Sequence, residues 1–198
     1  MSIESLLEPW LRRWQVPAEP LQDWMADIRV MSLQPEQFLL HSGELSRSIF
    51  LIESGLLRLF YADDAGRERN KAFYGPGDVT GPVSAIMAGS QATFSIQALE
   101  FTRCLQADLV TLLDIAPHHS AISRLMISLL ADAFTRNEQR ERLLLTCNAE
   151  QRYRWLLAEQ SELVGRIPQY HIAAYLGVDA VSLSRIKRKV DQQEECGS

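Results

Sequence analysis

The stretch QYHIAAYLGVDAVSLSRIKR, residues 169–188, has its apolar side chains spaced as in two short helices joined by a tight turn. Ile172 and Leu176 are four residues apart, which places both on one face of the first helix. Gly177 can adopt the positive φ that ends a helix, and Pro168 suits a helix start. The positions that carry the pattern are Ile172, Ala173, Leu176, Gly177, Val178, Leu183 and Ile186. They predict a helix-turn-helix, although an ordinary pair of packed helices would share much of this spacing.

The opposite side of the second helix is polar and basic. From Ala180 to Val190 the chain has four cations and no acid, although its formal net charge is -5. A short helix with such a face can enter the DNA major groove, and a basic patch on an acidic protein is typical of phosphate binding. We therefore predict double-stranded DNA as a partner. The expected contacts are Gln169, Tyr170, Val181, Ser182, Ser184, Arg185, Arg188 and Lys189.

These contacts fall into two kinds. Arg185 is expected to read a guanine through O6 and N7, with Val181 beside it to touch a thymine methyl. Ser182 is expected to bond a phosphate or to cap the helix. Gln169 and Tyr170 begin the first helix, where free amides can hold a phosphate. The remaining basic residues supply charge for the DNA backbone.

The length and composition of the chain limit the classes of protein to which it can belong. The chain has 198 residues, of which 46% are hydrophobic and 23% charged, so it can form one large or two small globular domains. No run of about 18 apolar residues is present. The start MSIESLLEPWLRRW lacks the basic end and apolar block of a secretory signal. We therefore expect a cytoplasmic protein with no membrane partner.

The reactive residue types form no recognisable site. Cys104, Cys147 and Cys196 are far apart, and the adjacent His118 and His119 would point about 100° apart on a helix. We find no nucleophile elbow, phosphate loop or metal-ligand spacing. The sequence therefore predicts no metal, no cofactor and no enzymatic activity.

The residues before the helix-turn-helix show three successive sequence patterns, of which the third is a long helix. Residues 1–30 have two apolar stripes of helical period, whose Trp side chains we expect to serve packing. Residues 31–107 have short apolar runs separated by glycine turns, which predicts an antiparallel barrel or double-sheet roll. The runs are Phe38–Leu40, Ile49–Ile52, Leu56–Tyr61, Lys71–Tyr74, Thr93–Leu99 and Phe101–Leu105.

A long helix is predicted over residues 118–147. Thirty helical residues would extend roughly 45 Å, and residues 135–142 should be solvated on all sides because they are polar throughout. Its apolar stripe has coiled-coil-like spacing, which favours a homodimer; packing on the barrel alone would also bury that stripe. The sequence ends DQQEECGS, and eight polar residues are unsuited to a β-hairpin, so we expect no wing after the second helix.

This order of elements resembles the Crp–Fnr superfamily of transcription regulators. In the barrel the resemblance rests on HSGELSRSIFLIESGLLRLFYADDAGRE and FYGPGDVTG, and at the C-terminus on RIPQYHIAAYLGVDAVSLSRIKRKV. It implies an α+β chain with an N-terminal cyclic-nucleotide-binding-like β-roll and flanking helices in residues 1–116. A long dimerisation helix (117–147) and a helix-turn-helix DNA-binding domain (148–198) would follow. It also implies a homodimer with one recognition helix in each half of a near-palindromic site.

The chain departs from this family at the effector pocket. Members that bind cyclic AMP carry a glutamate after the glycine that matches Gly81, and an arginine at the start of a later strand. Pro82 stands at the glutamate position, and Ala92 at the arginine position; a one-residue slip in the loop would put Gln91 there, which is not cationic either. An anionic phosphate without a cation is costly to bury, so we expect an unknown small-molecule effector, or none, in place of cyclic AMP. The candidate pocket residues are Gly81, Pro82, Val83, Ala92 and Thr93.

The reading face departs as well. Relatives that read a guanine-rich half-site often present a glutamate and an arginine four residues apart, and Val181 stands at the glutamate position, before Arg185. Valine cannot accept from cytosine N4, so base preference does not carry over. The small Ala180 and Val181 also leave an alternative open, a ligand-binding or protein-interaction module that has lost DNA binding.

Overall fold

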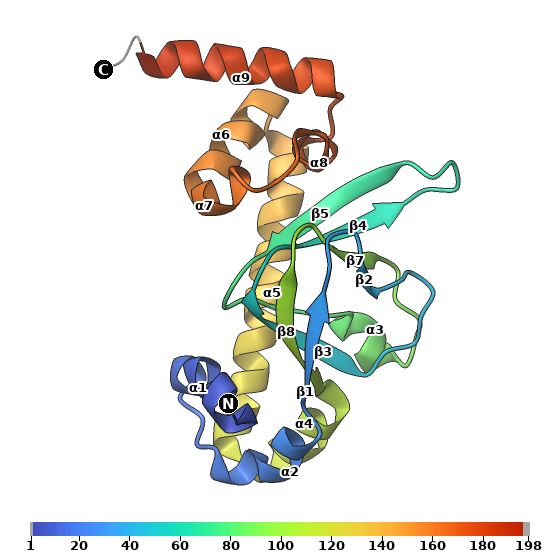
Figure 1. Cartoon of the computed structure of the whole chain (residues 1–198), viewed down its shortest axis with the longest axis vertical. Helices are drawn as coiled ribbons and strands as arrows, with labels where there is room; N and C mark the ends of the chain where they lie inside the picture. Colours follow the sequence, from blue (N-terminus) through green and yellow to red (C-terminus); the bar gives the residue numbers. More distant parts are fainter. Residues whose placement is uncertain (1, 196–198) are drawn as a thin grey trace.

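The computed structural model describes residues 2–195, and its fold is α+β. Two four-stranded antiparallel sheets face each other as a β-roll (Figure 1). One sheet has the order β1-β8-β3-β6 and the other β2-β7-β4-β5. The strands are β1 Arg29–Leu33, β2 Phe38–Leu40, β3 Ser48–Ser54, β4 Leu57–Ala62, β5 Glu68–Tyr74, β6 Val79–Thr80, β7 Ser95–Ala98 and β8 Thr102–Asp108. This confirms the predicted double-sheet roll.

Successive side chains of a strand point to opposite faces of its sheet, so the roll has two hydrophobic cores. In β3, Phe50 and Ile52 point between the sheets, where they pack with Phe94 and Ile96. Ile49 and Leu51 of the same strand point outward, against helices. The space between the sheets is thus occupied by large apolar side chains.

Helices from both ends of the roll cover that outward face. They are α1 Ile3–Trp14, η1 Glu19–Leu21, α2 Gln22–Ala26, α4 Leu109–Ile115 and η2 Ala116–His118. Trp10 is buried in this layer, and Trp24 is also buried and donates from Nε1 to the Asp108 carbonyl at 2.8 Å. The expectation that the Trp side chains serve packing is confirmed for Trp10 and Trp24, whereas Trp14 is half-buried and lines a cavity.

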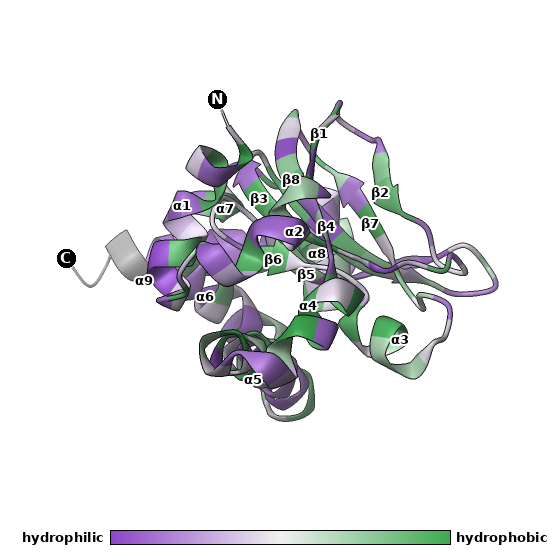
Figure 2. Cartoon of the chain, turned by 90° about the horizontal axis from the view of Figure 1, so that it is seen from below, coloured by the Kyte–Doolittle hydropathy of each residue, from purple (hydrophilic) through white to green (hydrophobic). Residues whose placement is uncertain are grey.

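The long helix α5, Ser120–Thr146, lies beside the β-roll rather than inside it (Figure 2). Its 27 residues extend about 40 Å. Ile122, Leu125 and Met126 are buried against the layer of α1 and α4. Large apolar side chains on the helix also remain exposed, and these are Ile127, Leu130, Phe134, Leu144 and Leu145.

Four helices complete the chain at the far end of α5 from α1 (Figure 1). They are α6 Ala149–Glu159, α7 Ser161–Val164, α8 Gln169–Leu176 and α9 Ala180–Glu195. Their hydrophobic core is continuous with the roll, because Leu56 and Phe73 pack among Ile167, Ile172 and Leu176. No helix of residues 2–195 combines the length and hydropathy needed to cross a bilayer.

Two local expectations need correction. Strand β1 begins at Arg29, inside the segment expected to be helical, because Arg29–Leu33 pairs along β8. Residues 135–142 are not solvated on all sides, since Arg140 lies against the ring of Tyr175. Helix α9 continues to Glu195, because the glutamines and glutamates after Val190 favour helix. The prediction of no wing also concerns residues 196–198, which lie outside the described chain.

Candidate nucleic-acid interface and effector pocket

The helix-turn-helix geometry follows from the residues that predicted it. Helix α8 ends at Gly177, whose φ of 73° and ψ of 30° are left-handed, and whose N–H donates to the Ala173 carbonyl. Val178 donates to the same carbonyl at 3.0 Å, which closes the turn. Ile172, Leu176 and Leu183 are almost completely buried, so α8 and α9 share one core.

Asp179 caps the start of α9. Its Oδ1 accepts from the Ser182 amide at 2.7 Å, and its Oδ2 accepts from the Ser182 hydroxyl at 3.1 Å. These bonds to the charged carboxylate lower the pKa of Asp179. Of the two roles expected for Ser182, helix capping therefore belongs to Asp179. The Ser182 hydroxyl is held by that cap in this structure.

The predicted base-reading face of α9 points to solvent. Val181 is 62% exposed, and Ser184, Arg185 and Arg188 are exposed as well. Tyr170, at the start of α8, is 58% exposed. An open groove runs between α8 and α9, and its lining includes Gln169, Ala180, Ser184, Lys187 and Arg188. Of the eight predicted DNA contacts, the groove thus brings together Gln169, Ser184 and Arg188, and Tyr170, Val181 and Arg185 are exposed on the same two helices.

Two lysines of α9 are engaged within the protein. Lys189 Nζ lies 2.6 Å from Glu150 Oε2 on α6, an ion pair that also lowers the pKa of Glu150. Lys187 Nζ donates to Gln169 Oε1 at 3.0 Å, which links α9 to the first turn of α8. Lys189, a predicted phosphate contact, is therefore partly neutralised before any ligand binds.

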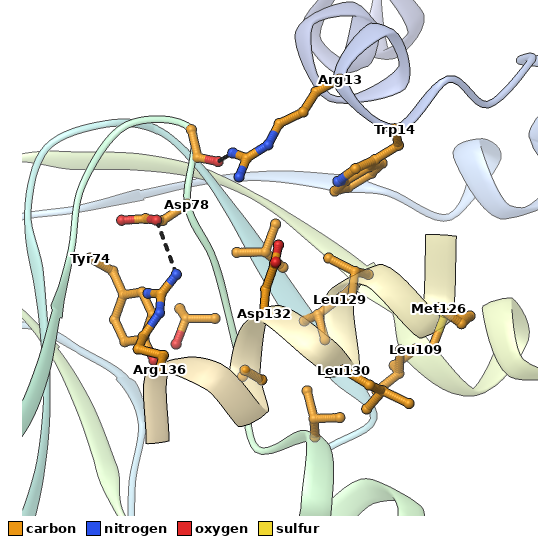
Figure 3. Close-up of a pocket in the computed structure, with 17 residues that line it drawn as sticks. Arg13, Trp14, Tyr74, Asp78, Leu109, Met126, Leu129, Leu130, Asp132 and Arg136 are labelled. Carbon is orange, nitrogen blue, oxygen red and sulfur yellow. Dashed lines mark hydrogen bonds and ion pairs between the residues drawn. The ribbon is translucent and has the colours of Figure 1, made fainter. Parts of the chain in front are cut away.

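The predicted effector residues do not form one pocket. Gly81 and Val83 line a cavity between α1, β6 and α5 (Figure 3), whereas Pro82, Ala92 and Thr93 are not among its lining residues. Pro82 precedes α3, Val83–Ala88, and is buried. Ala92 is buried between the sheets, and Thr93 is exposed. The positions that carry the glutamate and the arginine in cyclic-AMP-binding members are thus occupied by Pro82 and Ala92, and neither side chain is charged.

The cavity has a polar end and an apolar floor (Figure 3). At the polar end Arg136 lies 3.5 Å from Asp78 and over the ring of Tyr74, and Arg13 donates to the Gly77 carbonyl at 3.1 Å. Burial raises the pKa of Tyr74, an effect that Arg136 opposes. The floor consists of Leu109, Met126, Leu129 and Leu130. Sequence reasoning missed the arginines of this cavity, because 123 positions separate them and neither belongs to a local motif.

Comparisons with known proteins agree with this architecture. Residues 30–119 match the cyclic nucleotide-binding domain family. The regulatory protein HlyX of Actinobacillus pleuropneumoniae is 26% identical over 169 residues, which cover 80% of this chain and 70% of that protein. The structure of FixK2 from Bradyrhizobium japonicum superposes with a TM-score of 0.74 at 20% identity, covering 84% of this chain and 86% of that one. A regulator of the crp/fnr family from Eubacterium rectale gives a TM-score of 0.72 at 18% identity, with 92% and 87% covered.

In sequence and fold the chain is similar to the Crp–Fnr transcription regulators. The β-roll of this chain matches the cyclic nucleotide-binding domain, and the relatives to which the chain is similar are regulators. The resemblance to these regulators was available from the sequence. The pairing of Lys189 with Glu150 and the composition of the cavity in Figure 3 were not.

Proposed function

We propose that this chain is a homodimeric, sequence-specific DNA-binding regulator whose β-roll senses a small molecule other than a cyclic nucleotide. The observation that supports DNA binding best is the outward face of α9, where Arg185 and Arg188 are exposed on a chain of formal net charge -5. An exposed basic helix at the end of a rigid scaffold has the form of a major-groove reader.

Arg185 is the proposed base-reading residue, and its guanidinium would bond a guanine edge. Val181, one turn earlier, would contact a thymine methyl. Gln169 and Tyr170 at the start of α8, together with Arg188, would hold phosphates and set the register of α9 in the groove. In this proposal residues 1–116 form a sensor domain, residues 117–147 a dimerisation helix and residues 148–198 the DNA-binding domain.

Dimerisation would use the exposed apolar side chains of α5. Ile127, Leu130 and Phe134 are separated by three and four positions, which is the spacing of a coiled-coil seam. A twofold axis along this seam would give two copies of α9. Recognition of one duplex requires their separation to be about 34–36 Å.

The effector differs from the family's cyclic nucleotide. Pro82 and Ala92 supply neither a ribose acceptor nor a phosphate-binding cation, and Phe94 occupies the space between the sheets. The cavity between α1, β6 and α5 includes both arginines and acids, so it suits a small ligand of low net charge.

Selection of bound DNA from a random pool, with and without small molecules from a cell extract, tests this function. The expected result is one enriched near-palindrome, bound with a steep dependence of log affinity on log salt. Arg185→Ala should weaken that binding by about 1–3 kcal/mol and relax one position of each half-site. The matched control is Arg12→Ala, which removes the same charge from an exposed ion pair on α1, at the other end of the molecule. Binding with no sequence enrichment and no salt dependence would instead support the protein-interaction alternative.

A further inference from the structure

Helix α8 is docked on the β-roll of its own chain through a buried polar cluster. Arg58 on β4 is 3% exposed, and His171 on α8 is also 3% exposed. Arg58 Nη1 lies 3.3 Å from His171 Nδ1, and Asn70 Nδ2 on β5 donates to the His171 carbonyl at 2.8 Å. The first helix of the reading head is therefore fixed to the sensor by side chains that water does not reach.

The guanidinium of Arg58 is held in place from several sides. Its Nε and Nη2 donate to Gln97 Oε1 at 2.8 and 2.5 Å, and its Nη1 contacts Glu68 Oε2 at 2.5 Å and Asn70 Oδ1 at 3.3 Å. The ring of Phe60 lies 3.9 Å below it. Because Arg58 cannot move easily, His171 has to adapt to a fixed positive charge.

This geometry fixes the protonation state of the imidazole. An arginine only donates hydrogen bonds, so His171 Nδ1 must accept, and the proton must sit on Nε2. Nε2 is buried with no hydrogen-bond partner among residues 2–195. A second proton would have to enter at Nδ1, where it would abolish the bond and place two cations 3.3 Å apart.

We propose that Arg58 and His171 are positioning residues for DNA binding, whose contact fixes the helix-turn-helix on the β-roll, and that protonation of the imidazole releases it. The docked arrangement leaves the outer face of α9 exposed, so it presents the reading head in one orientation. This inference rests on the proposed function, because its consequence for DNA requires that α9 bind DNA.

The charged groups around His171 determine the direction of the pH effect. Burial and Arg58 lower the pKa of His171 to about 4, while Glu68 on β5 opposes them. Arg140 on α5 stacks on Tyr175 one turn along α8, and the ring of Tyr170 lies 4.1 Å from the imidazole. After release the pKa would return to roughly 6.5.

Acid therefore favours the released state. Docking is at full strength above pH 6.5, weakens as the pH falls from about 6.5 toward 4, and loses no more below that. From these two pKa values, the ratio of docked to released protein falls roughly 30-fold between pH 7.5 and 5.0. Arg166 adds a second tether, with bonds to the Gly55 carbonyl at 2.9 Å and to Glu100 at 2.5 Å, and the Glu100 carboxylate raises the pKa of its guanidinium.

The first test measures the imidazole directly in the full chain. His41, His118 and His119 are exposed, so replacing all three by glutamine leaves His171 as the only histidine with little risk to folding. Nuclear magnetic resonance of the ¹³Cε1-labelled ring should show a titration at least one pH unit below the ordinary value near 6.5. A titration at the ordinary value in the native dimer would overturn the proposal.

The second test compares wild type with His171→Gln, whose side-chain oxygen can still accept from Arg58 but cannot take a proton. At pH 7.5 hydrogen exchange in β5 and α8 should be equally fast in both proteins. At pH 5.0 it should be faster in wild type than in the variant measured at the same pH. Affinity for the selected DNA should fall by up to 30-fold in wild type between these pH values and by under about 3-fold in the variant. Equal acid sensitivity of the two proteins would refute the role of His171. If no DNA is bound at all, the proposed function fails, and the exchange difference still reports whether the contact is acid-sensitive.

Discussion

Phe134 offers the sharpest test of dimerisation through α5. Its side chain is 67% exposed although it is aromatic and lies near the middle of a 27-residue helix. Because most of the Phe134 side chain is exposed, it contributes little to packing within one chain, and its replacement by alanine removes little of that packing. Phe134→Ala should therefore leave the fold intact and weaken only association between chains.

The magnitude follows from the exposed area. A Phe side chain buries about 200 Å², so the 67% that is free on the monomer corresponds to about 130 Å². At about 25 cal/mol per Å² its burial contributes about 3 kcal/mol, of which alanine retains about one third. A twofold interface contains the residue twice, so the variant should lose about 4 kcal/mol, a factor of about 1000 in the dimer Kd.

Sedimentation equilibrium over a wide concentration range measures that Kd. Leu45→Ala is the matched control, because Leu45 is 73% exposed in the loop between β2 and β3 rather than on α5. The reasoning would be refuted if Phe134→Ala remained as dimeric as Leu45→Ala, or if wild type sedimented as a monomer throughout.

Three further outcomes are expected. Asp179→Ala should destabilise the protein by about 1 kcal/mol in urea unfolding, because the capping bond to Ser182 is lost; no change would mean that the cap carries no stability. Gly55→Ala should cost roughly 3 kcal/mol or more, since its Cβ would lie 2.5 Å from the Thr102 Cα at a φ of 99°. Gly43→Ala, with a φ of 89° but nothing within 4 Å, should cost only about 1–2 kcal/mol, and equal costs for the two would contradict the steric argument. Calorimetry with cyclic AMP should show no binding, and a Kd in the low micromolar range would overturn the interpretation of Pro82 and Ala92.

Local patterns were sufficient to predict much of the fold, including the two helices that carry the proposed reading face. The spacing from Ile172 to Ile186 specifies the helix-turn-helix, and Gly177 has the positive φ that its place in the pattern requires. The glycine turns likewise indicated the roll. These features depend on residues a few positions apart, so the sequence shows them directly.

Contacts between distant segments could not be predicted in this way. Ile28 extends the apolar stripe of the preceding helix, so the local pattern predicts helix where β1 begins, and only the pairing with β8 defines that strand. Arg58 and His171 are 113 positions apart, and Lys189 and Glu150 are 39 apart. Each pair is brought together by packing of whole elements, and no local spacing encodes that packing.

The base-reading role of Arg185 is open to the most direct measurement. In the selected DNA, each guanine can be replaced in turn by 7-deazaguanine, which lacks the N7 acceptor, and the affinities of wild type and Arg185→Ala can be compared in a double-mutant cycle. The account predicts one position in each half-site where the replacement costs wild type about 1–3 kcal/mol and costs the variant almost nothing. Equal losses for both proteins at every guanine would contradict it.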